Sequence, residues 1–583
     1  MAPAAGMQKK RWVVSPQSPA AAGIARALRI SPLLAQVLVN RGLGDSAACS
    51  SFLNPRLSDL LRPDLLPGAP EAADRIIAAV HNREKITIYG DYDVDGITGV
   101  AILWQLLTRL GADVDYYIPH RVEEGYGLNE EALRSLAQAG TKLVITVDCG
   151  ISALNCCRLA EQLPLELIIT DHHEIGSRIP NVSAVVHPGL DESYGNPDSA
   201  GAMVAFKLAW AIADRLNNAA RLSDPLRRFM LDATTLAAMG TIADVVDLRG
   251  ENRILAGYGL KALAGCRLPG IRALIESAGL AGRGLDSYDI GFRLAPMLNA
   301  AGRMGHARLA VELLTSNNDL RCAEIAEYLK QQNQKRRWRE KQIYEQACEM
   351  VSRRGLDRPE QKSLVLASAD WHTGIIGIVA SRIAETFHRP TIMINVDSPR
   401  PGLAQGSGRS IPGFSLLAGI SACSRCLLGF GGHRMAAGIS IESEKIELFA
   451  EQFENYARRH LNEEDVAARL HIDAVTRLSD LNIDTANQLR LLEPFGQGNP
   501  RPIFASLAVH LAAPPRKVGA NGDHLQLALS DNTGAIRCIG FRFGALEKKL
   551  LEQDYFDVAY NVQINEYNGN RSVELVLVDV RFD

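Results

Sequence analysis

The 583-residue chain has little that would mark a membrane or secreted protein. No apolar run approaches the roughly 20 residues needed to span a bilayer. The basic start Lys9-Lys-Arg11 is not followed by the apolar segment of a secretory signal. We therefore expect a cytoplasmic protein with no membrane partner. Its length is too great for one hydrophobic core, so two to four domains are expected.

The ten cysteines are scattered and lack the spacing of a zinc site. A structural zinc ion needs about four ligands, but the pair Cys423-Ser-Arg-Cys426 has no second pair to accompany it. Buried, reduced thiols are the favoured interpretation, and the pair receives no functional role.

The chain also lacks a surplus of basic residues. Lys and Arg number 63 against 66 Asp and Glu, which gives a net charge of −3. Because nucleic-acid-binding proteins are usually basic, bulk charge argues mildly against that class. Local clusters such as Lys335-Arg-Arg-Trp-Arg339 keep it open, since metal-binding aspartates would inflate the acidic count.

Two acidic clusters stand out, each directly after an apolar run. Asp91-Tyr-Asp-Val-Asp95 lies between the apolar segments 86–89 and 97–104, which predicts a strand, a tight acidic turn and a helix. Asp171-His-His173 follows the strand-like segment 165–170. Three carboxylates at alternate positions repel one another unless a cation lies among them, and carboxylates with imidazole suit Mn²⁺ or Mg²⁺. The pattern predicts a metal-dependent phosphoryl-transfer or hydrolytic site.

Two further apolar stretches end in a carboxylate. Segment 142–147 has a buried-strand pattern and ends in Asp148, and segment 237–243 ends in Asp244. In open α/β sheets, ligands bind at the carboxyl ends of parallel strands. We therefore expect all four segments to meet at one sheet edge, where a metal-bound water would attack phosphorus. No serine or cysteine nucleophile motif competes with this interpretation.

Composition along the chain predicts five parts. Residues 1–70 indicate an N-terminal helical cap, and alternating strands and helices at 71–317 predict a mainly parallel sheet. Segment 318–354 lacks Gly and Pro and indicates one long polar helix. Segment 355–465 predicts a second α/β unit, and the short strands and Asn-Gly turns of 466–583 predict an OB-type barrel. The expected fold is therefore α/β, with two α/β lobes joined by a long helix and a C-terminal OB-type β-barrel.

These motifs resemble those of a known family. The segments 90–96, 147–150, 171–173 and 240–244 are similar to the four motifs of the DHH phosphoesterase superfamily. Within it, the chain resembles the RecJ family of bacterial single-strand-specific 5′→3′ exodeoxyribonucleases, from about residue 10 to the end. Further segments that carry this resemblance are 292–303, 371–382, 407–410, 430–438 and 494–500. The resemblance implies that 71–317 is the DHH catalytic domain, that 355–465 is a DHHA1 domain and that 466–583 binds nucleic acid.

The resemblance implies a phosphodiester hydrolase of DNA repair and recombination with a two-ion site for Mn²⁺ or Mg²⁺. The implied catalytic residues are Asp93, Asp95, Asp148, His172, His173 and Asp244. The implied metal ligands are Asp91, Asp93, Asp95, Asp148, His172 and Asp244. Asp148 is expected to bridge the ions, and His173 to hold the scissile phosphate. Asp91 has the alternatives of capping the turn or supporting a ligand, and Asp171 that of orienting an imidazole.

DNA-binding residues are also implied by the resemblance. Ser407, Arg409 and Arg121 match positions associated with a terminal 5′-phosphate, which arginine can bind bidentately. The family usually has Asn before the arginine that corresponds to Arg121, whereas this chain has His120 there, and its role is left open. A narrow slot between the two lobes would admit one strand and exclude a duplex. Further phosphate-binding candidates are Asn299, Arg303, Gly432, His433 and Arg434.

The expected partner is single-stranded DNA with a 5′ end, and the resemblance adds single-strand-binding protein and a helicase. Two alternatives stay open. A DHH phosphodiesterase of short oligoribonucleotides or cyclic dinucleotides is disfavoured by the length and the OB-like tail. A non-catalytic DHH-fold replication scaffold is disfavoured by the intact aspartates and histidines.

Overall fold

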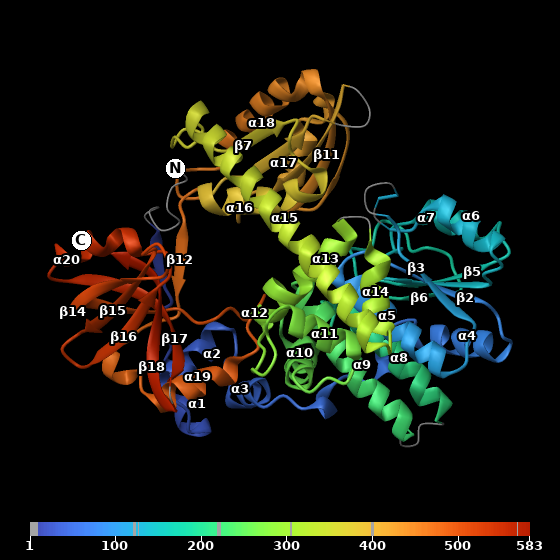
Figure 1. Ribbon diagram of the computed structural model, residues 1–583, viewed down its shortest axis with the longest axis horizontal. Helices are drawn as coiled ribbons and strands as arrows, with labels where there is room; N and C mark the ends of the chain where they lie inside the picture. The colour runs from blue at the N-terminus through green and yellow to red at the C-terminus, as the bar shows by residue number, and fades with distance from the viewer. Residues whose placement is uncertain are drawn as a thin grey trace. The chain divides into compact units, whose positions relative to one another are not determined.

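The computed structural model describes residues 10–120, 124–125, 127–217, 223–303, 306–397, 402–567 and 569–582, with the backbone alone at Arg303 and Tyr567. It divides into two compact units (Figure 1). One comprises 47–334 and 492–501, and the other comprises 1–46, 335–491 and 502–583. Among the described helices, none combines the length and the apolar character that a bilayer crossing requires.

The unit of residues 47–334 is built on a five-stranded, all-parallel sheet. Its strands lie in the order β3-β2-β4-β5-β6. The chain leaves β2 towards β3 on one side and later returns to β4 on the other, so the strand order reverses there. Such a switch point is where open α/β sheets bind ligands. The strands are β2 (Ile86–Gly90), β3 (Val114–Tyr117), β4 (Leu143–Val147), β5 (Glu166–Thr170) and β6 (Ala184–Val186).

Helices cover both faces of this sheet (Figure 1). The main core holds α4 (Ala69–His81), α5 (Val94–Arg109) and α8 (Gly201–Leu216), and the smaller core of the other face holds α6 (Glu130–Gln138) and α7 (Leu154–Ala160). Behind the first layer, α9 (Asp224–Ala243) packs against α5 and α8, and α10 (Gly250–Leu263) packs against α9. The mainly parallel sheet predicted from the alternation of strands and helices is confirmed.

The unit continues with α11 (Pro269–Ser277), α12 (Ser287–Asp289), the π-helix η4 (Ile290–Leu294), α13 (Ala295–Arg303) and α14 (Ala307–Thr315). From Ser287 to Arg303 the helical segments are consecutive. Pro296 explains the π-turn, because proline has no N–H and its ring displaces the carbonyl one turn earlier. The predicted long polar helix is confirmed as α15 (Asp319–Arg354), with 36 residues.

In the other unit, a mixed sheet has the order β10-β11-β9-β8-β7, and only β7 and β8 are parallel. One face packs on α16 (Thr373–Phe387), and the other packs on α17 (Leu416–Ala422) and α18 (Ile446–His460). The strands are β7 (Leu364–Ser368), β8 (Thr391–Asn395), β9 (Leu403–Arg409), β10 (Leu427–Gly432) and β11 (Ala436–Glu442).

The C-terminal strands form the predicted OB-type barrel. The sheet order is β13-β14-β15-β16-β18-β17, and it closes because β14 also pairs with β17. The strands are β13 (Ala474–Val475), β14 (Phe504–Val518), β15 (His524–Ser530), β16 (Ala535–Gly540), β17 (Phe556–Tyr567) and β18 (Asn570–Arg581).

The N-terminal segment, expected to be helical, also contains a strand. Serine N-caps begin α1 (Pro19–Leu28) and α2 (Pro32–Asn40), as the sequence pattern favours. Before them, β1 (Arg11–Val14) pairs in parallel with β12 (Arg469–Ile472). Its partner is more than 450 residues away, so no local pattern announces it.

Residues 492–501 belong to the unit of 47–334 although the chain on either side belongs to the other unit. The Arg253 side chain, 2% exposed, donates to the carbonyls of Leu492 and Glu493, each at 2.9 Å. Its guanidinium also lies 3.8 Å from the centre of the Phe52 ring. The buried Arg253 thus holds residues 492–501, the returning segment, against the unit of 47–334. The domain boundaries expected from composition remain predictions.

Candidate metal centre

Three neighbouring strands of the parallel sheet end in predicted site residues. Asp91 and Asp93 follow β2, Asp148 follows β4, and His172 follows β5. Because β2 and β4 flank the switch point, their carboxyl ends present these side chains to one place. This part of the arrangement is the one the sequence predicted.

The predicted ligands lie within coordination distance of shared points. His172 Nε2 is 3.1 Å from Asp148 Oδ1, 3.7 Å from Asp244 Oδ2 and 3.8 Å from Asp95 Oδ2. The candidate ligands form three groups, and within each group the ligand atoms lie within 4.8 Å of one another. The groups are Asp91–Asp93–Asp148, Asp95–His172–Asp244 and Asp148–His172–His173. Asp148 and His172 each belong to two of the groups, so these two side chains connect the cluster.

Asp244 reaches the cluster from a helix and not from a strand, contrary to the expectation that all four segments end at the sheet edge. It follows the last residue of α9, and its N–H donates to the carbonyl of Gly240 at 2.9 Å. The expectation failed because an apolar run cannot distinguish a buried strand from a buried helix. A helix C-terminus carries partial negative charge, so this carboxylate sits in an unfavourable field.

Asp148 has a left-handed backbone with φ 63°. Among non-glycine residues, Asp and Asn tolerate this region best. The turn directs the carboxylate back towards the sheet edge, where α8 approaches closely. A Cβ on Gly201, the first residue of α8, would lie 2.7 Å from Asp148 Cβ. A glycine at this position is therefore required for the helix and the carboxylate to coexist.

Two of the aspartates also cap helices. Asp93 is the N-cap of α5, and its Oδ1 accepts the N–H groups of Asp95 and Gly96. Asp95 is 1% exposed and accepts hydrogen bonds from Gly201 N, at 2.5 Å, and Ala202 N, at 2.9 Å. Asp95 thus binds the N-terminus of α8, where a negative charge is favoured. This second task was not predicted.

Burial, reinforced by mutual repulsion, dominates the electrostatics of the cluster. Burial, reinforced by the Asp93 charge, raises the pKa of Asp95 to about 7. Burial and the charges of Asp95 and Asp93 raise the pKa of Asp244 to about 9. The same two causes raise the pKa of Asp148 well above its usual range. Nearby positive charge would reverse these shifts.

The tandem histidines have opposite protonation tendencies. Burial, and then the neighbouring His173, lower the pKa of His172 to about 4, so its imidazole is neutral near pH 7. Burial opposes protonation of His173, but the hydrogen bond to Asp171, 2.7 Å from Nδ1 to Oδ1, raises its pKa above the ordinary value. Neutral imidazole is the form that binds metal, whereas a charged imidazole suits a phosphate oxygen.

The donor set therefore fits a divalent cation. It offers crowded carboxylates whose repulsion a cation would relieve, together with one neutral imidazole. Carboxylate oxygens with imidazole match Mn²⁺, and carboxylates with water match Mg²⁺.

His187 is a residue of this site that the sequence interpretation missed. It follows β6, and its Nε2 lies 2.8 Å from the carbonyl oxygen of His173. Its Nδ1 accepts the N–H of Gly189 at 2.9 Å. A polar residue directly after a strand was the signal used for Asp148, and the same rule would have found His187.

Of the DNA-binding candidates in this unit, the structure describes the side chain of Asn299 but not those of Arg121 and Arg303. The Asn299 side-chain oxygen accepts the N–H of Val94 at 3.1 Å, so it holds the first turn of α5 beside the cluster. Arg303 ends α13, and its side chain is outside the described residues. Arg121 also lies outside the described residues. His120 donates its backbone N–H to Glu124 Oε2 at 2.5 Å.

Ser407 and Arg409 lie in the other unit, on one face of β9 at alternate positions. Arg409 Nη1 donates to Ser407 Oγ at 3.1 Å. Helix α16 passes over this pair at Gly377, where a Cβ would lie 2.9 Å from Ser407 Oγ and 3.1 Å from an Arg409 nitrogen. The pair is thus preassembled under a helix.

Gly432 is the last residue of β10, and His433 and Arg434 begin the exposed turn that leads to β11 of the same unit. Gly432 has φ 141°, and a Cβ there would lie 2.4 Å from the carbonyl oxygen of Ala436. The His433 N–H donates to that carbonyl at 2.7 Å. A side chain at residue 432 would therefore collide with the opposite strand.

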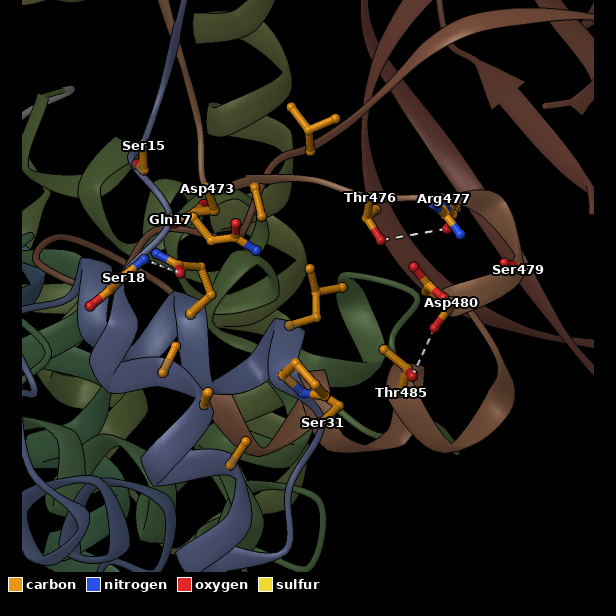
Figure 2. Close-up of a pocket in the computed structure, with 18 of the residues that line it drawn as sticks. Ser15, Gln17, Ser18, Ser31, Asp473, Thr476, Arg477, Ser479, Asp480 and Thr485 are labelled. Carbon is orange, nitrogen blue, oxygen red and sulfur yellow. Dashed lines mark hydrogen bonds between the residues drawn. The ribbon is translucent and has the colours of Figure 1, made fainter. Parts of the chain in front are cut away.

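The unit that carries Ser407 also has a cleft of about 1660 Å³ that contains none of the predicted site residues. Figure 2 shows its polar lining, which comes from the N-terminal segment and from the chain around β13. Much of this lining is engaged locally. Thr485 Oγ1 donates to the Asp480 carbonyl at 3.0 Å, and the Ser18 N–H donates to Gln36 at 2.9 Å.

Three family models match the chain. They are the DHH family N-terminal domain at residues 85–240, the DHHA1 domain at 360–459 and the RecJ OB domain at 472–579. The first covers β2 to most of α9 and so includes every predicted ligand except Asp244. Each model falls within a part of the chain for which the sequence motifs implied that domain.

The relatives share both sequence and fold with the chain. The single-stranded-DNA-specific exonuclease RecJ of Bacillus subtilis is 38% identical, over 98% of this chain and 71% of its own length. The RecJ of Escherichia coli is 32% identical, over 94% and 96%. The crystal structure of RecJ in complex with Mn²⁺ from Thermus thermophilus superposes with a TM-score of 0.82 at 31% identity, over 98% of this chain and 80% of that one. Such similarity along almost the whole chain cannot arise from shared metal-site motifs alone, and the chain belongs to the RecJ family of single-stranded-DNA-specific exonucleases.

Proposed function

We propose that this protein hydrolyses single-stranded DNA from its 5′ end with the help of Mn²⁺ or Mg²⁺. The observation that carries the proposal is the cluster of five aspartates and His172 at the switch point, in a chain that is similar to RecJ exonucleases over nearly its whole length. A phosphodiesterase of short oligonucleotides is not favoured, because the chain shares with RecJ exonucleases the OB-type barrel as well as the metal-site motifs.

The residues that would hold two ions are Asp91, Asp93, Asp95, Asp148, His172 and Asp244. When bound there, the ions would lower the pKa of a water and neutralise charge on the phosphate. Asp93 and Asp95 are fixed by the two helix N-termini that they cap, so the cluster is preorganised before any ligand arrives.

His173 would contact the scissile phosphate. Asp171 accepts a hydrogen bond from its ring and receives N–H groups from Ile151 and His172, so both the ring and the turn are held. The raised pKa of His173 favours the imidazolium, which donates to a phosphate oxygen and stabilises charge there.

Recognition of the chain end is proposed for the other unit. Ser407 and Arg409 would bind the terminal 5′-phosphate, and residues 432–434 would contact the adjacent phosphate backbone of the DNA strand. Arg121 and Arg303 are further candidates for phosphate contacts. The OB-type barrel would bind the strand beyond the active site through stacking and charge.

We further propose that the protein acts in the cytoplasm in DNA repair and recombination, with a helicase and a single-strand-binding protein as partners. All ten cysteines are buried, and none of them forms a disulfide, as suits a reducing compartment.

Digestion of end-labelled DNA tests the proposal. With metal present, a 5′-labelled single strand should release its label as mononucleotide from the first turnover, whereas a 3′-labelled strand should shorten progressively. A blunt duplex should resist. Release of the 3′ label first, or equal digestion of the duplex, would contradict the proposal.

A further inference from the structure

Two exposed aromatic rings lie on the helix that braces the metal loop. Tyr288 and Phe292 are 56% and 61% exposed, and their rings stack with centroids 4.6 Å apart and an interplanar angle of 24°. They stand one turn apart, at the α12–η4 junction, while Ile290 and Leu294 of the same segment are buried in the core. Large rings on the solvent side of a well-packed helix offer a flat apolar face to a ligand.

The position of the pair connects it to the candidate metal centre. Seven residues after Phe292, on the same side of the continuous helical segment, Asn299 accepts the N–H of Val94, the residue that follows Asp93. One turn further, Gly302 lies so close to the loop that a Cβ would be 2.6 Å from the carbonyl oxygen of Tyr92. At a rise of 1.5 Å per residue, the rings lie about 10 Å along the helix from this anchor. That length corresponds to about three stacked nucleotides at 3.4 Å each.

The pair is held rigidly. Asp286 and Asp289 form a capping box at the start of α12. Ser287 Oγ donates to the carbonyl of Phe495, at 2.5 Å, in the returning segment 492–501. The π-turn that contains Phe292 packs against α9, and π-turns recur at functional sites. A rigid aromatic surface loses little conformational entropy when it binds a ligand.

Charge around the rings suits a polyanion. Arg283 and Arg293, both about half exposed, share the single carboxylate of Asp289, at 2.8 and 3.4 Å. Arg501 lies 3.8 Å from Asp286. Three guanidinium groups thus face two carboxylates, which leaves a local excess of positive charge beside the stacked rings. Aromatic rings flanked by arginines are the usual surface for unpaired nucleobases.

We propose that Tyr288 and Phe292 form a base-stacking platform that holds the single strand about three nucleotides from the phosphate to be cut. The inference rests on the proposed function and deepens it, because it assigns a nucleobase-binding site to residues that the motif resemblance leaves without a role. Stacking needs an aromatic face and no particular base, so the platform contributes affinity for single strands without sequence preference.

Steady-state digestion of long oligothymidylate by the metal-loaded protein tests the platform. Phe292→Ala should raise KM by about ten-fold to a hundred-fold, the loss expected for one stacked base, while kcat changes little. Phe292→Leu, which keeps apolar bulk without an aromatic face, should behave like Phe292→Ala. Phe292→Tyr should retain the parental KM. Because the side chain is exposed, thermal unfolding of each variant should match that of the parent.

An abasic scan supplies the second readout. In the parent, abasic positions at about the third nucleotide from the cut should raise KM, and on those strands Phe292→Ala should add no further loss. A parental KM in Phe292→Ala, or the same loss on abasic and intact strands, would overturn the platform and leave the rings as a docking surface for another molecule. Failure of the parent to digest any single strand with metal would instead contradict the proposed function itself.

Discussion

Gly240 lies where three helices of the catalytic unit meet, and its replacement by alanine should separate activity from stability. A Cβ at this position in α9 would lie 2.5 Å from Ala202 Cβ, 2.5 Å from Thr98 Oγ1 and 2.6 Å from Asp95 Oδ1. Ordinary contacts between heavy atoms are about 3.5–4.0 Å, so α5, α8 or α9 must move by about 1 Å.

The expected magnitudes follow from that displacement. Overpacking costs about 1–3 kcal/mol, and the better helix propensity of alanine offsets about 0.5–1 kcal/mol. The net loss in the free energy of unfolding is therefore between about 0 and 2.5 kcal/mol, to be measured by urea denaturation. Because Asp95 is one of the displaced groups, kcat should fall by about a hundred-fold, the effect expected of a 1 Å misplacement.

Gly257→Ala is the matched control in the same unit. It lies within α10, and a Cβ there would meet its nearest atom, Pro494 Cδ, at an ordinary 3.8 Å. This variant should be as stable as the parent or about 0.5–1 kcal/mol more stable, with parental kcat. Parental kcat in Gly240→Ala would refute the claim that Asp95 must be held in place.

Three further predictions concern other parts of the molecule. Lys207→Met should lower the free energy of unfolding by about 3–5 kcal/mol, because it leaves Glu251, 2.5 Å from Lys207 Nζ, as an uncompensated buried charge. Burial lowers the pKa of Lys207 below its ordinary 10.5, so between the folded and unfolded pKa values the unfolded state binds more protons. In that pH range the parent's free energy of unfolding should contain a component that rises with pH and that Lys207→Met lacks. The same pH dependence in parent and variant, measured by urea denaturation, would contradict this. Arg409→Ala should reduce the preference for 5′-phosphorylated over 5′-hydroxyl strands by about ten-fold to a hundred-fold, the value of a charge-assisted hydrogen bond of about 1.5–3 kcal/mol, and equal losses on both substrates would return Arg409 to general backbone binding. Asp148→Ala and His172→Ala should each abolish cleavage, and the double variant should lose little more in single-turnover assays, since ligands act as a unit; additive losses would show that they act separately.

Local features of the fold were predictable, and distant pairings were not. The strand, acidic turn and helix around Asp91–Asp95 follow from apolar runs and turn chemistry that lie within 20 residues. The pairing of β1 with β12 and the return of residues 492–501 join segments hundreds of residues apart. They depend on tertiary packing, such as the carbonyls that surround Arg253, and a local pattern cannot reveal them.

The same limit applies to the candidate site. Residue types and strand ends pointed to Asp148 and His172, because the carboxyl ends of parallel strands meet at one edge of a sheet and bring their side chains together. They did not reveal that Asp95 caps α8, which begins 106 residues later, or that Asp244 ends a helix. Nor did they identify Gly201 and Gly240, whose importance lies in the side chains that they lack.

Metal-dependent digestion is the most direct test of the central claim that the aspartate cluster binds the catalytic ions. The protein should be stripped with a chelator and titrated with Mn²⁺ or Mg²⁺ while release of mononucleotides from a 5′-labelled single strand is followed. We predict no release without metal, recovery on titration, and no recovery in Asp148→Asn, which keeps the size of the side chain but removes its charge. Digestion that persists in the stripped protein, or full recovery in Asp148→Asn, would contradict the account.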